Sequence, residues 1–108
     1  MRTDKEYRVV LVAAPRGREA GRLARGLVES RLAACVSVVP GVVSHYRWEG
    51  KARRDSESLL VVKTTFAKLQ ALELWVKARH SYSVPEIVVL AVSAGSKEYL
   101  RWLSAQVR

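Results

Sequence analysis

The chain has a single cysteine, Cys35, among its 108 residues, so it cannot form an internal disulfide. This excludes the small secreted folds that disulfides hold together and favours a reducing compartment. Long apolar runs are also lacking, because nothing approaches the ~20 residues of a membrane helix. The first apolar run, 9–14, is shorter than the ~7–15 residues of a signal-peptide core. We expect a cytoplasmic protein that does not bind a membrane.

Acidic residues are scarce: 10 Asp+Glu stand against 19 Lys+Arg, which gives a formal net charge of +9. Excess positive charge favours nucleic acid or another anionic partner. The basic residues are scattered, however, and neither a basic run with interleaved aromatic residues nor a helix-turn-helix pattern is present. We therefore expect no specific nucleic-acid partner.

The motifs of common enzyme and metal classes are also missing. The sequence contains no Walker loop and no GxGxxG, GxSxG, HExxH or CxxC pattern. Its two histidines, His45 and His80, and its one cysteine are too few for a closed zinc site of four ligands without carboxylates or a second subunit. No motif therefore assigns a substrate class.

What the chain does contain is a regular alternation of strand and helix patterns. Apolar runs of strand length predict strands, and apolar stripes every three to four residues predict helices. The predicted elements, in chain order, are a strand at 7–14, a helix at 18–29, strands at 35–48 and 51–64, a helix at 66–79, a strand at 87–92 and a helix after Ser96. This order predicts one α+β domain over residues 1–108. Two right-handed βαβ crossovers would give a ferredoxin-like, four-stranded antiparallel sheet with two helices on one face.

Two of these elements carry predictions about burial. The strand at 87–92 has almost no polar alternation, so we expect it to be buried on both faces. The last helix, which Ser96 would cap, is expected to bury one arc of side chains: Tyr99, Leu100, Trp102 and Leu103.

The central hairpin is too long for a domain of this size. Its first strand, 35–48, would extend about 46 Å, whereas a compact domain of this length is only about 35 Å across. The hairpin must therefore bend, for which Pro40–Gly41 is the expected place, or protrude. A protruding edge with Tyr46 and Trp48 on one face is prone to aggregate unless a partner covers it. We expect an oligomer.

The densest polar cluster is HSYSVPE at 80–86, between the second helix and the last strand. It gathers His80, Tyr82 and Glu86 around one loop, and Lys63, near the end of the preceding strand, is expected nearby. An imidazole, a phenol, a carboxylate and an amine together can serve general acid–base chemistry, which makes an enzyme one alternative. The same residues suit a loop held by hydrogen bonds and an ion pair under a helix end.

Cys35 follows two alanines at the joint between a helix and a strand. Only small side chains suit such a joint, and free cysteine is among the most buried residue types. No neighbouring motif activates the thiol. We interpret Cys35 as a packing residue, and a soft-metal ligand paired with His80 is the alternative.

Four segments together resemble the CutA family of divalent-cation-tolerance proteins. They are VVLVAAP, RLAACVSVVPGVVSHYRWEGK, LLVVKTT and SYSVPEIVVLAVSAGSKEYLRWL, and they lie in family order and spacing over roughly residues 7–106. The resemblance implies a ferredoxin-like subunit in a tight homotrimer, similar in architecture to the PII signalling proteins. It also implies a role in the response to divalent cations, and copper or another divalent cation as the bound metal.

The resemblance implies site residues as well. Positions that match the family pattern give a binding cleft of Glu57, Lys63, Tyr82 and Glu86, and a trimer interface at Tyr46 and Trp48. The family's proposed copper ligands are a first-strand cysteine and two adjacent histidines, and these positions hold Val12, Arg79 and His80 in this chain. The remaining metal candidates are His80 and Cys35.

Two other functions stay open beside the metal response. A PII-like protein would sense a small anionic ligand, or act as an assembly module, through clefts between subunits. An enzyme would use the acid–base cluster of His80, Tyr82, Glu86 and Lys63.

Overall fold

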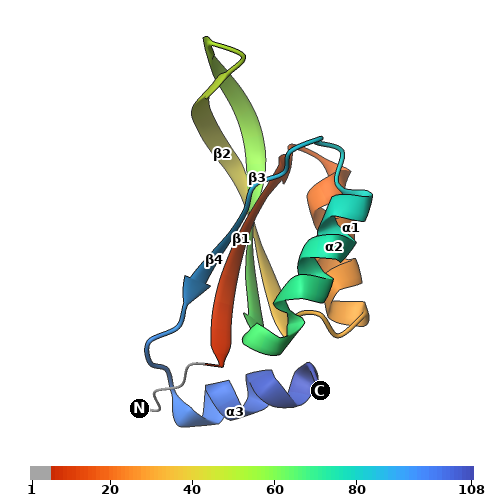
Figure 1. Cartoon of the computed structure of the whole chain (residues 1–108), viewed down its shortest axis with the longest axis vertical. Coiled ribbons are helices and arrows are strands. Elements are labelled where there is room, and N and C mark those ends of the chain that lie inside the picture. Colours follow the sequence, from red (N-terminus) through yellow and green to blue (C-terminus); the bar gives the residue numbers. More distant parts are fainter. Residues whose placement is uncertain (1–5) are drawn as a thin grey trace.

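The computed structural model describes residues 6–108 (Figure 1). Its elements are β1 (Tyr7–Pro15), α1 (Arg18–Glu29), β2 (Cys35–Trp48), β3 (Lys51–Thr65), a 3-10 turn (Phe66–Lys68), α2 (Leu69–Arg79), β4 (Ile87–Ala91) and α3 (Lys97–Gln106). The strands form one antiparallel sheet in the order β2-β3-β1-β4. α1 and α2 cover one face of the sheet, and α3 lies across its end (Figure 1). The predicted α+β order, βαββαβ with a C-terminal helix, is confirmed.

The core lies between the sheet and the two helices α1 and α2. Side chains alternate along a strand, so every second residue of the central strands β1 and β3 points toward the helices. The fully or almost fully buried side chains of this core are Val10, Val12, Leu60, Val62, Leu23, Leu27, Leu72 and Val76. Burial of each such side chain stabilises the fold by about 1.5–3 kcal/mol. This layer is the rigid frame that carries the loops and the hairpin.

The hairpin of β2 and β3 both bends and protrudes beyond the rest of the sheet (Figure 1). The molecule measures 44 × 25 × 23 Å. The pairing register shifts between Val39 and Val42, around Pro40–Gly41. Proline has no N–H for the ladder, and Gly41 takes a positive φ of 73°, which glycine adopts at little cost. The bend predicted at Pro40–Gly41 is confirmed.

The prediction that the last strand is buried on both faces is wrong within one chain. Val88, Val89 and Leu90 of β4 are 46%, 43% and 46% exposed. The reason is that β4 is an edge strand that pairs only with β1, and residues 6–108 offer no layer for the sheet face opposite α1 and α2 (Figure 1).

The burial prediction for α3 is right for half of its arc. Leu100 and Leu103 are buried in a small cluster with Tyr7, but Tyr99 and Trp102 are 43% and 44% exposed. The helix meets only the end of the sheet (Figure 1), so only one narrow stripe of its side chains is packed against other residues.

Like the other helices described for residues 6–108, α3 does not have the length and apolar character needed to cross a membrane.

Two glycines of α1 allow a matched test of helix packing. A Cβ added at Gly26 would lie 2.5 Å from ring carbons of Trp75, whereas nothing lies within 4 Å of one at Gly21. The guanidinium of Arg79 lies over the Trp75 ring at 4.2 Å, which restricts the ring's escape. Alanine is favoured over glycine in a helix by about 0.5–1 kcal/mol, so Gly21→Ala should raise the free energy of unfolding by this amount. Gly26→Ala should lower it by about 1–3 kcal/mol through overpacking. Urea denaturation of both variants is the measurement, and a gain for Gly26→Ala would contradict the close contact between α1 and α2 at this position.

Candidate functional site

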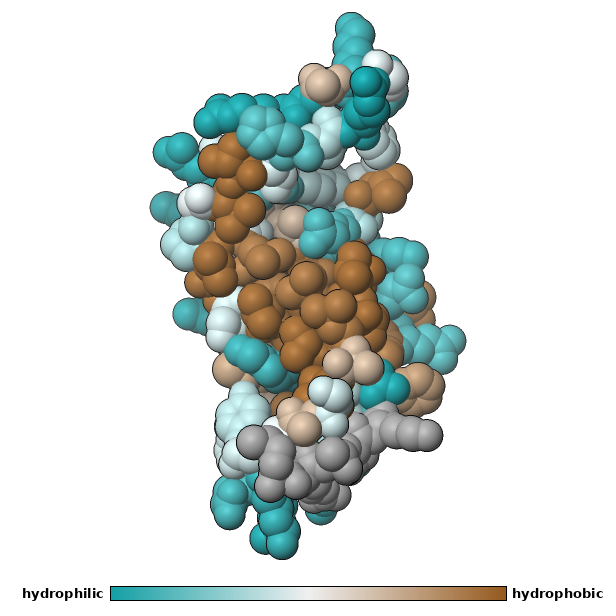
Figure 2. All heavy atoms as spheres, turned by 90° about the vertical axis from the view of Figure 1, so that its left-hand side faces the viewer, coloured by the Kyte–Doolittle hydropathy of each residue, from teal (hydrophilic) through white to brown (hydrophobic). Residues whose placement is uncertain are grey.

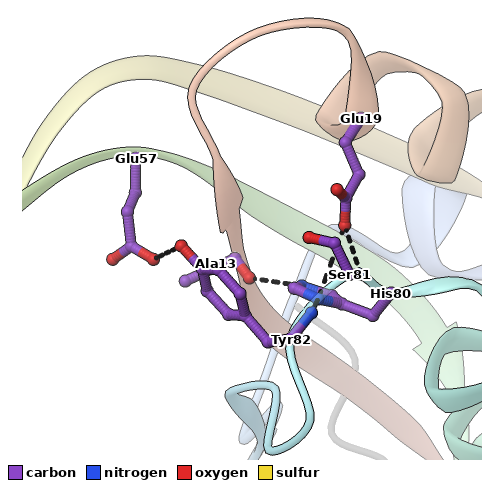
Figure 3. Close-up of polar contacts among 6 residues, drawn as sticks. All are labelled: Ala13, Glu19, Glu57, His80, Ser81 and Tyr82. Atoms are coloured by element: carbon purple, nitrogen blue, oxygen red, sulfur yellow. Dashed lines mark hydrogen bonds and ion pairs between the residues drawn. The ribbon is translucent and has the colours of Figure 1, made fainter. Parts of the chain in front are cut away.

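The loop after α2 is held in place by His80, whose side chain is fully buried. Its Nδ1 accepts the backbone N–H of Tyr82 at 3.0 Å, and its Nε2 lies 2.8 Å from the carbonyl oxygen of Ala13 in β1 (Figure 3). Because Nδ1 accepts a hydrogen bond, the proton sits on Nε2 and is donated to Ala13. Both ring nitrogens of His80 are therefore engaged in positioning the loop.

Glu19, in the first turn of α1, fixes the same loop from the other side. Its Oε2 accepts the backbone N–H of Ser81 at 2.9 Å and lies 3.5 Å from Nδ1 of His80. Burial raises the pKa of the Glu19 carboxyl, but hydrogen bonds from Ser81 and the positive charge of Arg22 lower it more. Sequence reasoning missed Glu19. Its only signal there is an acidic residue in a first helical turn, which is common for reasons of helix dipole alone.

We expect Glu19 to make part of the stability depend on pH. The pKa of Glu19 is lowered in the folded state, so its carboxylate stabilises the fold at pH values above the ordinary glutamate pKa of 4.5. This contribution to the free energy of unfolding is lost as the pH falls through the lowered pKa. The free energy of unfolding should therefore fall more steeply between about pH 5 and pH 3 in the wild type than in Glu19→Gln. Urea denaturation across this range checks the difference, and parallel pH profiles would contradict it.

The side chain of Tyr82 connects the loop with β3. Its hydroxyl donates a hydrogen bond to Oε2 of Glu57 at 2.8 Å (Figure 3). Burial and this bond to Glu57 raise the pKa of the Tyr82 hydroxyl well above its ordinary value. The phenol therefore stays protonated at neutral pH and acts as a donor.

Glu57 is only 8% exposed, and glutamate is almost never buried so deeply unless it is paired. Its one hydrogen-bond partner among residues 6–108 is the Tyr82 hydroxyl. None of the ion pairs of the described residues involves it. Glu57 is thus a buried carboxylate without a cation in a chain of net charge +9.

Glu57 and Tyr82 line a cleft of about 680 Å³ between the 80–86 loop and the hairpin, and it extends along the hairpin as far as Trp48 beside the turn. The hairpin adds Tyr46, whose hydroxyl donates to Oδ2 of Asp55, and this bond raises the pKa of the Tyr46 hydroxyl. The acidic and aromatic residues of the lining are Tyr46, Trp48, Asp55, Glu57, Tyr82 and Glu86. Three acidic residues line the cleft, and no lysine or arginine among residues 6–108 does. These three carboxylates disfavour the expected anionic ligand at this place.

Lys63 is not part of the cleft, and the expectation that it lies beside the loop is wrong. It sits on β3 six residues from Glu57, about 20 Å along the strand. Its Nζ donates to Oγ of Ser37 at 2.7 Å. The reason is the antiparallel register: Lys63 pairs with the start of β1, whereas His80 contacts Ala13 near the end of β1. The structure therefore does not assemble the acid–base centre of the enzyme alternative.

Cys35 is half-buried at the start of β2. Its Sγ lies 3.8 Å from Nζ of Lys63, with which Cys35 is paired across the sheet, so it is far from His80 at the other end of β1. Among residues 6–108 no group of three or more His, Cys, Asp or Glu side chains is placed to hold a metal ion. The described residues of one chain therefore assemble no set of three ligands for a copper ion.

The antiparallel sheet, its helices and the cleft beside the 80–86 loop define a class of small α+β proteins. Comparison with known sequences identifies the family within this class. A family model described as CutA1 divalent ion tolerance protein matches residues 8–106. The divalent-cation tolerance protein CutA of Thermus thermophilus is 52% identical over 95 residues, which cover 88% of this chain and 92% of that protein. The CutA of Pectobacterium atrosepticum is 46% identical over 100 residues, 93% and 91% of the two chains. The chain belongs to the CutA family of divalent-cation tolerance proteins.

Solved structures agree with this assignment. The Thermus thermophilus protein superimposes with a TM-score of 0.92 at 48% identity and covers 94% of this chain and 99% of that one. CutA1 from Oryza sativa gives a TM-score of 0.93 at 43% identity, with 99% and 98% covered. The chain spans only about half the length of its chloroplastic plant relatives, 55% of the Arabidopsis thaliana protein, to which it is 48% identical.

Proposed function

We propose that this CutA chain acts in divalent-cation tolerance as a cytoplasmic homotrimer. The observation that carries the proposal is an uncovered apolar sheet face. Because Val10 and Val12 point to the helices, their neighbours in β1 and the residues paired with those neighbours share the opposite face. We call it the open face, and it comprises Val9, Leu11, Leu59, Val61, Val88 and Leu90. Figure 2 shows apolar side chains gathered on this side of the molecule, below the hairpin.

A contiguous apolar patch on a soluble protein marks an interaction surface. Packing copies of this chain through the open face would give β4 the second layer that its apolar sequence predicts. Tyr46 and Trp48 on the hairpin, 39% and 43% exposed, would border a neighbouring copy in the same assembly while they still line the cleft. The exposed face calls for a partner, and the number three rests on the family resemblance.

Sedimentation equilibrium tests the assembly. At micromolar concentration we expect the mass of three 12.1 kDa chains, about 36 kDa. A stable 12.1 kDa monomer under these conditions would refute the trimer.

We propose that the tolerance concerns copper or another divalent cation. We also propose that it does not depend on a tight metal site within one chain. The ring nitrogens of His80 are both engaged. The thiol of Cys35 lies beside the ammonium group of Lys63, which repels cations.

A strain that lacks the protein should lose tolerance to added copper salts and regain it with the wild type or with Cys35→Ala. Calorimetry should show no stoichiometric, tight Cu(II) site, and such a site abolished by Cys35→Ala or His80→Ala would contradict this assignment.

A PII-like role in small-ligand binding is the second candidate, and the cleft of about 680 Å³ favours it. Pockets for small molecules in proteins span roughly 300–1,000 Å³ and combine apolar walls with a few polar groups. The CutA of Synechococcus elongatus has been solved in complex with a Bis-Tris molecule. We propose that the cleft of this chain is likewise a binding site for a small ligand.

A further inference from the structure

The carboxylate of Glu57 has one oxygen that no group of residues 6–108 binds and that the cleft leaves accessible. Glu57 is 8% exposed, and the Tyr82 hydroxyl engages only one of its oxygens. A buried carboxylate is costly unless a cation or several hydrogen bonds compensate it. Residues 6–108 supply no cation to Glu57, and its second oxygen is not shut off from the cleft, so this oxygen is available to a positively charged group from outside the chain.

The walls of the cleft indicate what kind of cation this is. Tyr46, Trp48 and Tyr82 line it together with Glu57. Faces of tryptophan and tyrosine rings attract ammonium groups and bind the carbon skeleton that carries them. Arg53, which lies across the hairpin from Tyr46, donates from Nε to the carbonyl oxygen of Trp48 at 3.5 Å and is not among the lining residues. The hairpin therefore contributes no lysine or arginine to the lining, and His45 is the one basic side chain that it adds there.

We propose that this cleft binds a small organic amine, with its ammonium group on the carboxylate of Glu57 and its carbon chain against Tyr46, Trp48 and Tyr82. The inference rests on the proposed ligand-binding role of the cleft and names the class of its ligand. Asp55 and Glu86 stand at the same cleft and add to the attraction for a cation.

Two other ligand classes fit less well. A bare divalent ion such as Ca²⁺ requires six to eight oxygen ligands, and residues 6–108 place no three candidate ligand residues around one point. A phosphate or carboxylate ligand would meet three carboxylates and no lysine or arginine in the lining. Aromatic walls with carboxylates suit an organic cation better than either.

The test is calorimetric titration of the assembled wild-type protein with 1,4-diaminobutane at physiological ionic strength, beside 1,4-butanediol, MgCl₂ and inorganic phosphate. The diol has the same carbon chain without charge. We expect saturable binding of the diamine, and binding of the diol, Mg²⁺ and phosphate at least ten times weaker. Glu57→Gln removes the charge and keeps an acceptor for the Tyr82 hydroxyl, so diamine affinity should fall at least tenfold. Glu73→Gln, an exposed carboxylate on α2 paired with Lys77, is the matched control and should change it less than twofold.

Several results would overturn the proposal. Equal binding of the diol and the diamine, tighter binding of Mg²⁺ or phosphate, or unchanged diamine affinity in Glu57→Gln would each do so. If the wild type does not bind the diamine and Glu57→Gln dissociates the assembly, the cation that pairs with Glu57 is a side chain of a neighbouring copy. Should Glu57→Gln fail to fold, Asp55→Asn provides the second variant, because Asp55 is exposed. Its affinity for the diamine should fall at least threefold, and an unchanged affinity would count against the cleft as the binding site. Because the wild-type mass is measured independently, a monomer refutes the trimer alone, whereas a trimer that does not bind the diamine refutes this inference alone.

Discussion

Leu90→Glu is expected to convert the assembled protein into 12.1 kDa monomers with the fold retained. Leu90 lies on the edge strand β4, is 46% exposed in the single chain and pairs with Val9 on the open face. If copies of the chain bury this face against one another, the substitution places one unpaired carboxylate per chain in an apolar interface. Burying such a charge costs several kcal/mol per ion, which exceeds what the lost leucine contact alone contributes. Sedimentation equilibrium measures the mass, and circular dichroism reports whether the monomer stays folded.

Leu74→Glu is the control for this substitution. Leu74 is even more exposed, at 64%, but it lies on α2, on the helix side of the sheet. Glutamate is nearly as good a helix former as leucine, so the fold and the mass of the assembly should both be unchanged. Dissociation of both variants, or of neither, would show that the open face is not the interface.

The comparison of β4 with the core strands shows what a sequence can predict. Periodicity is a property of one chain, so the apolar runs of β1 and β3 predicted these strands and the order of elements correctly. The structure then places Val10, Val12, Leu60 and Val62 of these strands in the core. The apolar run of β4 predicted burial with equal force. A pattern cannot say whether the covering layer belongs to the same chain or to another copy, and here the described part of the chain, 6–108, provides none.

The cleft shows a second limit. Sequence spacing and the family resemblance pointed to Tyr82, Glu57 and Glu86, which the structure does bring to one cleft. They also pointed to Lys63, which lies on the same strand as Glu57 but six residues away. Glu19 gave no signal beyond an acidic residue in a first helical turn, because its contact with Ser81 joins residues 62 positions apart. Such contacts depend on the register of the sheet and the placement of α1 on it, and local composition encodes neither.

His80→Ala is expected to lower the free energy of unfolding by about 2–4 kcal/mol. The side chain is fully buried, so its removal leaves a cavity between the loop and β1. The carbonyl of Ala13 and the N–H of Tyr82 also lose their hydrogen-bond partner. Because the second of these bonds sets the backbone of Tyr82, the hydroxyl of Tyr82 should leave Glu57 more often and the affinity of the cleft for amines should fall as well.

Two variants separate this effect from a general response of the loop to mutation. His80→Gln has an amide nitrogen at the reach of Nε2, so it keeps a donor for Ala13 and should lose about half as much stability, on the order of 1–2 kcal/mol. Ser81→Ala changes the exposed neighbour, whose backbone N–H still donates to Glu19, and should cost less than about 1 kcal/mol. Urea denaturation at one fixed protein concentration ranks the three variants, since the stability of an oligomer depends on concentration. A loss for His80→Ala no larger than that for Ser81→Ala would mean that the imidazole does not anchor the loop, and His80 would then again be a candidate for metal binding.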